Sequence, residues 1–562
     1  MNDLRFAFRM LVKNPGFTAV AMLTLALGIG ANTAIFSVFK ALVLEPLPYP
    51  DALRLVHVWK SDIAIRDNMP LSGPDYFDLR EQSSCFEALG AYTTTWHNLG
   101  GNKPKRIQGI LCTAGLLHAL GVQPALGRWF TEAEEQAGTR RVVVLSHRLW
   151  QERYGGDPAL VGRTIVVNGE AHEVVGITPP GFQFLSPWYR GNPFEVWTPL
   201  VLSRDEKERN WCYYLGLGRL KPDLPIRACL QAAQTELRTI GQRVAEAHPN
   251  THHRKVFWAM PILFQCVGAN ILSRLLLLFL IAGSVLLVAC ANVAGMLLAK
   301  GADRQAEVAI RFALGASRAR IIRQWLVEIL VLALIGGLAG AWLAAGGLGF
   351  LREMLPADLP RADGIRMDLW VLLFTLALSV VTAFLCGVAP ALTVSRARPI
   401  EVIKGGGLSG GFGGQSRRRL LPKLAVGQLA IALCLGNIAI LLLLSYRRVL
   451  DSPQGFDEQR VLTADVFLWG SRYEKPEQKT RFWRQLLERA EALPGVDAAA
   501  VTTKLPLEGG RNGEVLVAGE FFDLQSKRPL TEMSWVSPRY FHAMGIPLLA
   551  GRTMKPGLSA GG

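Results

Sequence analysis

The chain has 562 residues; half are hydrophobic and only 19% are charged, whereas ordinary soluble domains carry about 25% charged residues. This composition indicates a membrane protein. The formal net charge of +16 is gathered in short segments beside apolar runs, which is typical of basic loops in a membrane protein rather than of a nucleic-acid-binding surface, so no nucleic-acid partner is expected.

Five apolar runs are each long enough to cross a bilayer as a helix, which takes about 20 residues. Backbone polar groups in lipid have to be satisfied within the segment, so these runs are predicted to be helical. A cleaved signal peptide is the alternative for the first run, but that run exceeds the roughly 7–15 apolar residues of such a peptide. The predicted transmembrane helices are 17–39, 275–299, 326–350, 369–392 and 424–446.

The positions of Lys and Arg predict the orientation. Segments 1–16, 300–325 and 393–423 are rich in Lys and Arg, whereas the loop 351–368 carries a balance of both charges. By the positive-inside rule, the three basic segments are cytoplasmic. Segments 40–274, 351–368 and 447–562 are then expected on the outer side of the membrane.

Segment 40–274 is large enough to be a domain, and its patterns are those of an α+β fold. The run Val142–Leu145 predicts a buried strand, and Thr164–Val167 with Glu173–Ile177 predicts a hairpin that turns at Asn168-Gly169. Apolar residues spaced by three and four predict an amphipathic helix whose stripe faces the core: Ile226, Leu230, Ala233, Leu237, Ile240 and Val244.

Histidine and cysteine usage predicts no metal site. The pair His252-His253 has no second ligand at metal-binding spacing, so we expect a solvated loop there. None of the eight cysteines has CxxC spacing. Three of them lie in apolar runs and five lie in the large external segment. The sequence leaves open whether two of these five form a disulfide, and an odd number leaves at least one free thiol.

The chain repeats itself. The segment Leu116–Arg128 aligns with Tyr540–Arg552, and His118, Gly121 and Arg128 recur as His542, Gly545 and Arg552 at constant spacing. The fifth apolar run then matches the first as the lead-in to a second external domain, at 447–562. The first copy continues well beyond this motif and the second does not, so the sequence predicts an incomplete second copy and a truncated chain.

No catalytic constellation is expected, and the chain is not expected to be an enzyme. Gly407-Leu408-Ser409-Gly410-Gly411 matches the hydrolase pattern G-x-S-x-G, but it lies in a glycine-rich tract between two predicted spans instead of between a strand and a helix. The phosphate-binding pattern G-x-x-x-x-G-K-[ST] is absent from the sequence. We therefore predict no catalytic residues, no bound cofactor and no metal.

The loop 300–325 carries the most informative pattern. It predicts a short amphipathic helix with charged residues on one face and Ala306, Ile310, Ala313 and Leu314 on the other; Gly315 ends this helix and Ser317 caps the next. It is either an interfacial helix on anionic lipid or a docking site for a cytoplasmic partner. The candidate functional residues are Arg304, Glu307, Ile310, Arg311, Leu314 and Gly315.

Within the spans, small residues four apart predict close helix packing, as at Gly28 with Asn32 and at Gly336 with Gly340. Asn292 and Asn437 are expected to bond across helices. No Asp, Glu or Lys lies at mid-membrane, which argues against an ion-coupled carrier.

These motifs together resemble a known family. The segment Arg304–Ala316 resembles the cytoplasmic loop of FtsX-like and MacB-like ABC permeases. The N-terminal run FRMLVKNPGFTAVAMLTLALGIGANTAIFSV resembles the start of a MacB-type permease, and Ser72–Tyr76 and Leu145-Ser146 resemble the MacB-like periplasmic core. The doubled layout resembles the duplicated acidobacterial-type permeases.

The resemblance implies an α-helical membrane protein with about five transmembrane helices, an α+β MacB-like periplasmic core domain and a partial second copy, in the inner membrane. Residues 275–400 would form the FtsX-like permease domain, and 300–325 would hold the coupling helix. A separate cytoplasmic ABC ATPase would bind ATP and move the periplasmic domain during export, with the lipid bilayer and a periplasmic adaptor or enzyme as further partners. The alternative is a non-transport envelope regulator that controls a periplasmic enzyme.

Overall fold

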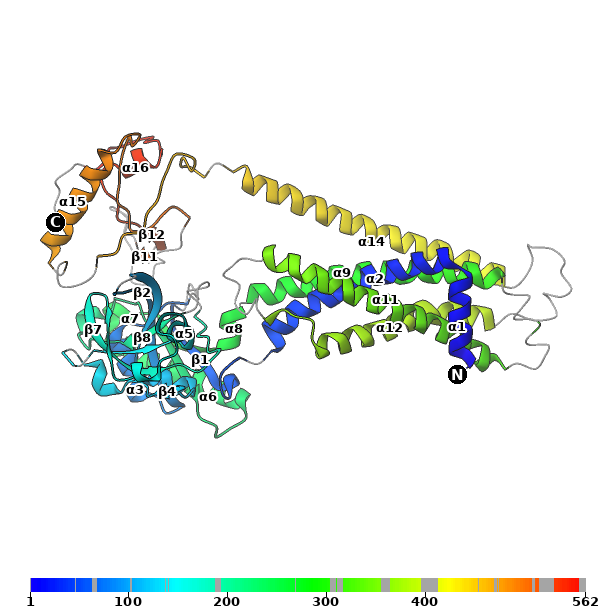
Figure 1. Ribbon diagram of the computed structural model, residues 1–562, viewed down its shortest axis with the longest axis horizontal. Coiled ribbons are helices and arrows are strands. Elements are labelled where there is room, and N and C mark those ends of the chain that lie inside the picture. Colours follow the sequence, from blue (N-terminus) through cyan, green and yellow to red (C-terminus); the bar gives the residue numbers. More distant parts are fainter. Residues whose placement is uncertain are drawn as a thin grey trace. The chain divides into compact units, whose positions relative to one another are not determined.

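The computed structural model describes most of the chain. The described residues are 2–45, 47–62, 68–101, 104–136, 138–139, 141–186, 194–267, 269–303, 310, 317–354, 364–395, 413–452, 454–468, 473, 475–507, 511–514 and 530–554. They divide into two compact units, one formed mainly by the long apolar helices and one formed mainly by the external segments (Figure 1).

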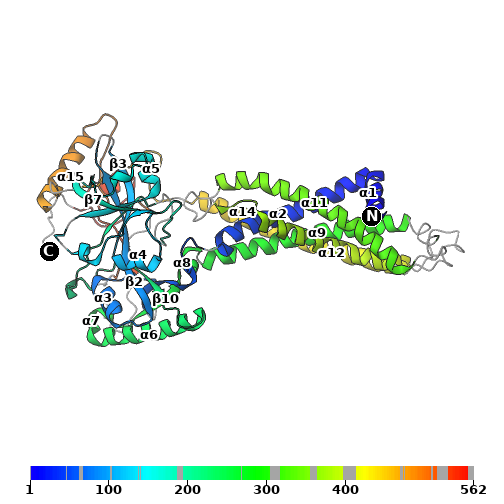
Figure 2. The same cartoon turned by 60° about the horizontal axis from the view of Figure 1, so that its bottom comes forward.

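The first unit is a bundle of long helices. Five described helices are long and apolar enough to cross a membrane, as the hydropathy predicts. Four of them, α2, α9, α11 and α12, run alongside one another (Figure 2). The helices are α1 (Asn2–Lys13), α2 (Pro15–Phe39), a π-helical turn η1 (Lys40–Leu44), α9 (Ala269–Asp303), α11 (Arg318–Met354), α12 (Leu369–Ser395) and α14 (Gly413–Leu450).

The second unit is built on one large sheet of ten strands. Its order is β10-β1-β9-β2-β3-β8-β5-β7-β4, with β6 paired to β2 and β7. Most pairs are antiparallel, while β3–β8 and β5–β7 are parallel. The strands are β1 (Leu55–Asp62), β2 (Phe86–Leu99), β3 (Lys105–Cys112), β4 (Leu126–Gly127), β5 (Val142–Leu145), β6 (Thr164–Val167), β7 (Glu170–Ile177), β8 (Val196–Pro199), β9 (Leu215–Leu220) and β10 (Lys255–Pro261).

Helices complete this domain. They are α3 (Gly73–Gln82), α4 (Ala114–Leu120), α5 (His147–Tyr154), α6 (Ile226–Ala247) and α7 (Pro249–His252), with short 3-10 turns η2 (Ala52–Arg54), η3 (Glu132–Glu135), η4 (Pro158–Leu160) and η5 (Glu206–Glu208). The short helix α8 (Ile262–Val267) belongs to the first unit from its second residue on. The helix α6 lies beside β10 (Figure 2). Its amphipathic stripe packs into the core from Ala233 to Val244, as predicted, whereas Ile226 at the start of the stripe is exposed and does not face the core. The hairpin β6–β7 is also confirmed, since Asn168 (φ 53°) and Gly169 (φ 80°) have the left-handed backbone of its tight turn.

A second external segment carries α15 (Pro476–Glu491), β11 (Arg511–Glu514), β12 (Leu530–Met533) and α16 (Tyr540–Ala543). It reproduces a hydrogen-bond pair of the first domain. Thr113 N–H donates to Ala91 O (2.9 Å) and its hydroxyl accepts from Ala91 N–H (3.0 Å). In the second segment Ser537 N–H donates to Val501 O (2.9 Å) and its hydroxyl accepts from Val501 N–H (2.9 Å). The two segments therefore share local backbone structure as well as sequence.

Candidate functional site

The predicted coupling segment lies between two long helices of the bundle. Arg304, Glu307, Arg311, Leu314 and Gly315 lie outside the described residues, and of this segment the structure describes only Ile310, which is helical and exposed. The flanking helix α9 ends at Asp303 and α11 begins at Arg318. The Ser317 hydroxyl accepts a hydrogen bond from Arg320 N–H (3.4 Å), which is the cap predicted for α11.

Glycines bring α2 and α11 into backbone contact. A Cβ atom at Gly30 would lie 2.8 Å from Gly340 O, and one at Gly340 would lie 2.7 Å from Ala26 O. A Cβ atom at Gly28 would lie 2.9 Å from the Leu286 side chain of α9, and one at Gly336 would lie 3.1 Å from the Leu25 side chain of α2. The predicted close packing of small residues is confirmed at these positions, and it joins α2 firmly to the helix that follows the coupling segment.

Polar side chains inside the bundle bridge helices at positions that the sequence did not single out for this role. Asn32 Nδ2 donates to Gly28 O of its own helix (2.9 Å) and to Ala282 O of α9 (3.0 Å). The hydroxyls of Thr33 and Thr375 lie 3.0 Å apart and join α2 to α12. Asn437, expected to bond across helices, instead donates to Leu433 O of its own helix (2.9 Å), so that prediction is wrong.

The far end of α2 carries an ion-paired junction. Lys40, the first residue of the π-helical turn η1, pairs with Glu45 (3.3 Å) and with Asp368, which lies just before α12. Asp368 Oδ1 also accepts a hydrogen bond from Val371 N–H (3.1 Å) and so caps α12. This junction fixes the end of the first span to the start of the fourth.

A buried charge cluster lies in the external domain, centred on Asp75 at the start of α3. The Asp75 carboxylate is fully buried and accepts hydrogen bonds from Lys60 Nζ of β1 (2.7 Å) and from the Ser72 N–H group (2.9 Å). His252 Nε2 of α7 lies 2.7 Å from its other oxygen, and Arg209 Nη1 lies 3.5 Å away. The cluster therefore joins a strand, two helices and a loop that are distant in the sequence.

The charges in this cluster shift one another's pKa values. Burial alone would raise the pKa of Asp75, but the Lys60 charge and the His252 hydrogen bond outweigh it, and the pKa lies well below its usual range. Burial lowers the pKa of His252, an effect that Asp75 partly offsets. The prediction of a solvated loop at His252 is wrong, because this side chain is only 1% exposed and is held by Asp75.

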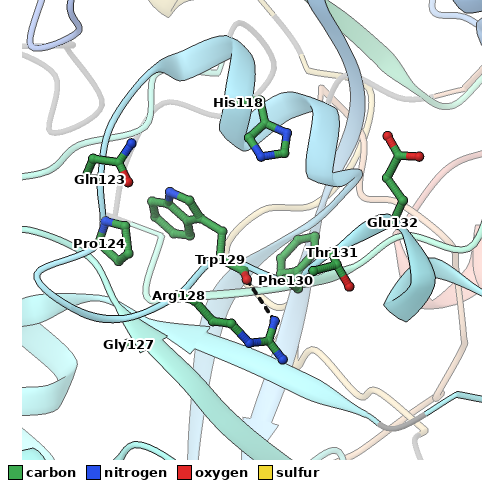
Figure 3. A pocket seen from close by; sticks show the side chains of 9 residues that line it. All are labelled: His118, Gln123, Pro124, Gly127, Arg128, Trp129, Phe130, Thr131 and Glu132. Atoms are coloured by element: carbon green, nitrogen blue, oxygen red, sulfur yellow. Dashed lines mark hydrogen bonds between the residues drawn. The ribbon is translucent and has the colours of Figure 1, made fainter.

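A cavity of the external domain forms around the repeated motif. Its volume is about 560 Å³, and it lies between α4 and the strand β4 (Figure 3). Arg128 at its edge pairs with Glu134 (2.7 Å), and Glu132 pairs with Arg80 (2.6 Å). The cavity is lined by His118, Gln123, Pro124, Gly127, Arg128, Trp129, Phe130, Thr131 and Glu132.

The repeated glycines have a folding role. Gly121 ends α4 at φ 67° and its counterpart Gly545 has φ 66°; Gly127 (φ 73°) and Gly551 (φ 90°) match in the same way. These left-handed conformations favour glycine at all four positions. The recurrence of the motif is thus explained by backbone geometry, and it does not require a shared ligand.

Gly127→Ala is expected to lower the thermal stability of the external domain. The new Cβ atom would collide with Val175 O across the β4–β7 pair, and its left-handed backbone adds about 1–2 kcal/mol of strain. Gly162→Ala is the matched control, since φ is 88° and nothing lies within 4 Å of its Cβ. Melting of the purified chain, followed by tryptophan fluorescence, should show a larger drop for Gly127→Ala; equal drops would contradict the predicted collision.

Two family models match separate stretches of the chain. The MacB-like periplasmic core domain matches residues 18–221, and the FtsX-like permease C-terminal domain matches residues 279–399. The chain belongs to the MacB/FtsX-like ABC transporter permeases. Five candidate membrane-spanning helices and an α+β core domain of the MacB periplasmic type are the fold expected from the sequence.

Relatives of this MacB/FtsX-like permease include proteins named as combined ATP-binding/permease proteins and one named as a permease alone. The macrolide export ATP-binding/permease protein MacB of Burkholderia lata is 28% identical over 51% of this chain and 39% of its own length. The uncharacterized ABC transporter permease YknZ of Bacillus subtilis is 24% identical over 52% of this chain and 68% of its own. The chain spans about two fifths of the length of the export ATP-binding/permease proteins it matches.

Among solved structures, the periplasmic region of MacB from Actinobacillus actinomycetemcomitans is similar to this permease. It covers 37% of this chain and 88% of its own, with 13% identity and a TM-score of 0.26.

Proposed function

We propose that this MacB/FtsX-like permease is the membrane subunit of an ABC-type export system whose ATPase is a separate protein. The match of the FtsX-like permease domain to residues 279–399 carries this proposal, because it spans α9, the predicted coupling segment, α11 and α12. In this proposal ATP is bound by the partner, and the sequence contains no phosphate-binding loop.

In this mechanism the segment 304–316 is the coupling helix. It joins α9 to α11, and α11 is in backbone contact with α2 through Gly340 and Gly30. A displacement of the coupling helix by the ATPase would move α11 together with α2. The α2 helix leads through η1 into β1, the first strand of the external domain, so motion would pass along the chain to that domain.

The interior of the bundle favours motion of helices over passage of a solute. Several of its buried polar side chains bond across helices, as in the Thr33–Thr375 pair and the bond from Asn32 to Ala282 O. Hydroxyl and amide pairs of this kind hold helices in register. Transport would therefore act on a substrate at the external domain, and export of a molecule outside the inner membrane is the proposed outcome.

Glu307→Lys is expected to abolish association with the partner ATPase while leaving membrane insertion intact. The reversal places a positive charge between Arg304 and Arg311, whose spacing puts all three on one face of the predicted helix. The measurement is copurification of a nucleotide-binding protein with the full chain. Glu477→Lys, on the external helix α15, is the control and should leave association unchanged. Retention of the ATPase by Glu307→Lys would exclude this segment as the coupling helix.

A further inference from the structure

The N-terminal helix α1 is held in a fixed position on the bundle. Asn14 breaks the helix between α1 and α2 with φ −128° and ψ 69°, and α1 runs across the end of α2 instead of continuing it (Figure 1). The Thr18 hydroxyl of α2 donates to Leu11 O (2.8 Å), and Asn14 Nδ2 donates to Met10 O (3.2 Å). Two carbonyl groups at the end of α1 thus accept hydrogen bonds from side chains at the junction between α1 and α2, which we call the elbow.

Packing also fixes the rotation of α1 about its own axis. Ala7 is fully buried and Leu11 is 8% exposed, and both belong to the bundle core with Ile321 and Trp325 of α11. These two residues are four apart and so lie on one side of the helix. The opposite side of α1 is consequently directed away from the bundle.

That outward side combines apolar and basic residues in separate rows. Phe8 (56% exposed) and Val12 (74% exposed) are four apart and form an apolar row. Arg5, Arg9 and Lys13 are exposed, also four apart, and form the adjoining basic row. None of these three cations makes an ion pair with any residue that the structure describes.

We propose that α1 is a binding site for anionic phospholipid, with the basic row on headgroup phosphates and the apolar row in the acyl boundary. A helix that lies across a span, with basic and apolar rows side by side, has the geometry of an interfacial helix. The span α2 begins directly after the elbow, so α1 lies at the depth where headgroups occur. An acidic protein surface would pair with the cations, but it would leave Phe8 and Val12 unexplained.

Hydrogen exchange of the backbone amides of α1 in the full chain tests this site. The chain is placed in nanodiscs of phosphatidylcholine alone, of phosphatidylcholine mixed with phosphatidylglycerol, and of phosphatidylcholine with inorganic phosphate added to the buffer. Exchange should slow by about fivefold for each cation that engages anionic lipid. Phosphatidylglycerol should produce this slowing and inorganic phosphate should not; slowing by phosphate alone would show a free-anion site and overturn the proposal.

Two variants separate lipid binding from a loss of structure. Arg5→Gln with Arg9→Gln should reduce the slowing by phosphatidylglycerol to the contribution of Lys13, about fivefold. Arg5→Lys with Arg9→Lys should keep the full response. Arg481→Gln with Arg484→Gln, exposed on the external helix α15, is the charge-matched control and should respond like the unaltered chain. Equal exchange of the unaltered chain in both lipid mixtures would refute the site, as would a response retained in full by the Gln pair or slowing that needs an added protein.

Discussion

Replacing Asp75 by alanine is expected to lower the free energy of unfolding of the external domain by about 3–5 kcal/mol. The substitution leaves the Lys60 ammonium, whose side chain is 3% exposed, without its carboxylate, and it also removes the partner of His252. Burying an uncompensated charge costs far more than an ion pair contributes. Thermal melting of the purified chain should show a fall of roughly 10 °C for the transition of this domain.

The control for Asp75→Ala is Glu152→Ala, which removes a carboxylate that is 53% exposed and pairs with Arg148 at 2.8 Å. Exposed pairs contribute about 0–1 kcal/mol, so its melting temperature should hardly change. The double replacement Lys60→Met with Asp75→Leu removes both buried charges and should recover much of the loss. Equal melting of Asp75→Ala and Glu152→Ala would contradict a buried, mutually dependent cluster.

Gly340→Val is expected to separate α2 from α11 and to destabilise the membrane bundle by about 3 kcal/mol. The new Cβ atom would lie 2.7 Å from Ala26 O and 2.9 Å from Gly30 N, both backbone atoms that cannot rotate away. The proposed coupling passes through this contact, so the substitution should also reduce ATP-dependent export. Melting of the bundle in nanodiscs and export by reconstituted chain with its ATPase are the two measurements.

Gly346→Val is the matched control on the same helix, because nothing lies within 4 Å of its Cβ position. Both changes place a β-branched residue in α11, so a difference between them isolates the helix contact from helix propensity. If Gly346→Val is as disruptive as Gly340→Val, the close approach of α2 and α11 does not explain the result.

Elements with a local cause could be predicted from the sequence. The β6–β7 hairpin follows from Asn168-Gly169, which favours the left-handed conformations that a two-residue turn needs. The spacing of apolar residues along α6 reflects one buried face, and Gly336 and Gly340 lie where a neighbouring helix comes close. In each case a few neighbouring residues contain the whole physical reason.

The buried cluster could not be predicted, because its reason is spread over the chain. Asp75 and His252 meet only after β1, α3 and α7 pack together, and no spacing rule links residues so far apart. Two local signs were present in the sequence. Ser72 and Asp75 have the spacing of a capping box, and Lys60 follows five largely apolar positions of a buried strand. Either sign indicates a buried charge in need of a partner, but neither identifies that partner.

The π-helical turn at the end of the first span has a mechanical consequence. In η1 each N–H group bonds to the carbonyl five residues back instead of four, so Lys40–Leu44 accommodates one residue more than an α-helical turn. If the turn converts to α-helix, each bond is exchanged for another of the same kind, while the side chains beyond it rotate by about 100°. Pulling or twisting at this point would therefore change the phase of the chain entering β1 without breaking the helix. In the π-helical form, Lys40 is paired with Asp368 at the start of α12.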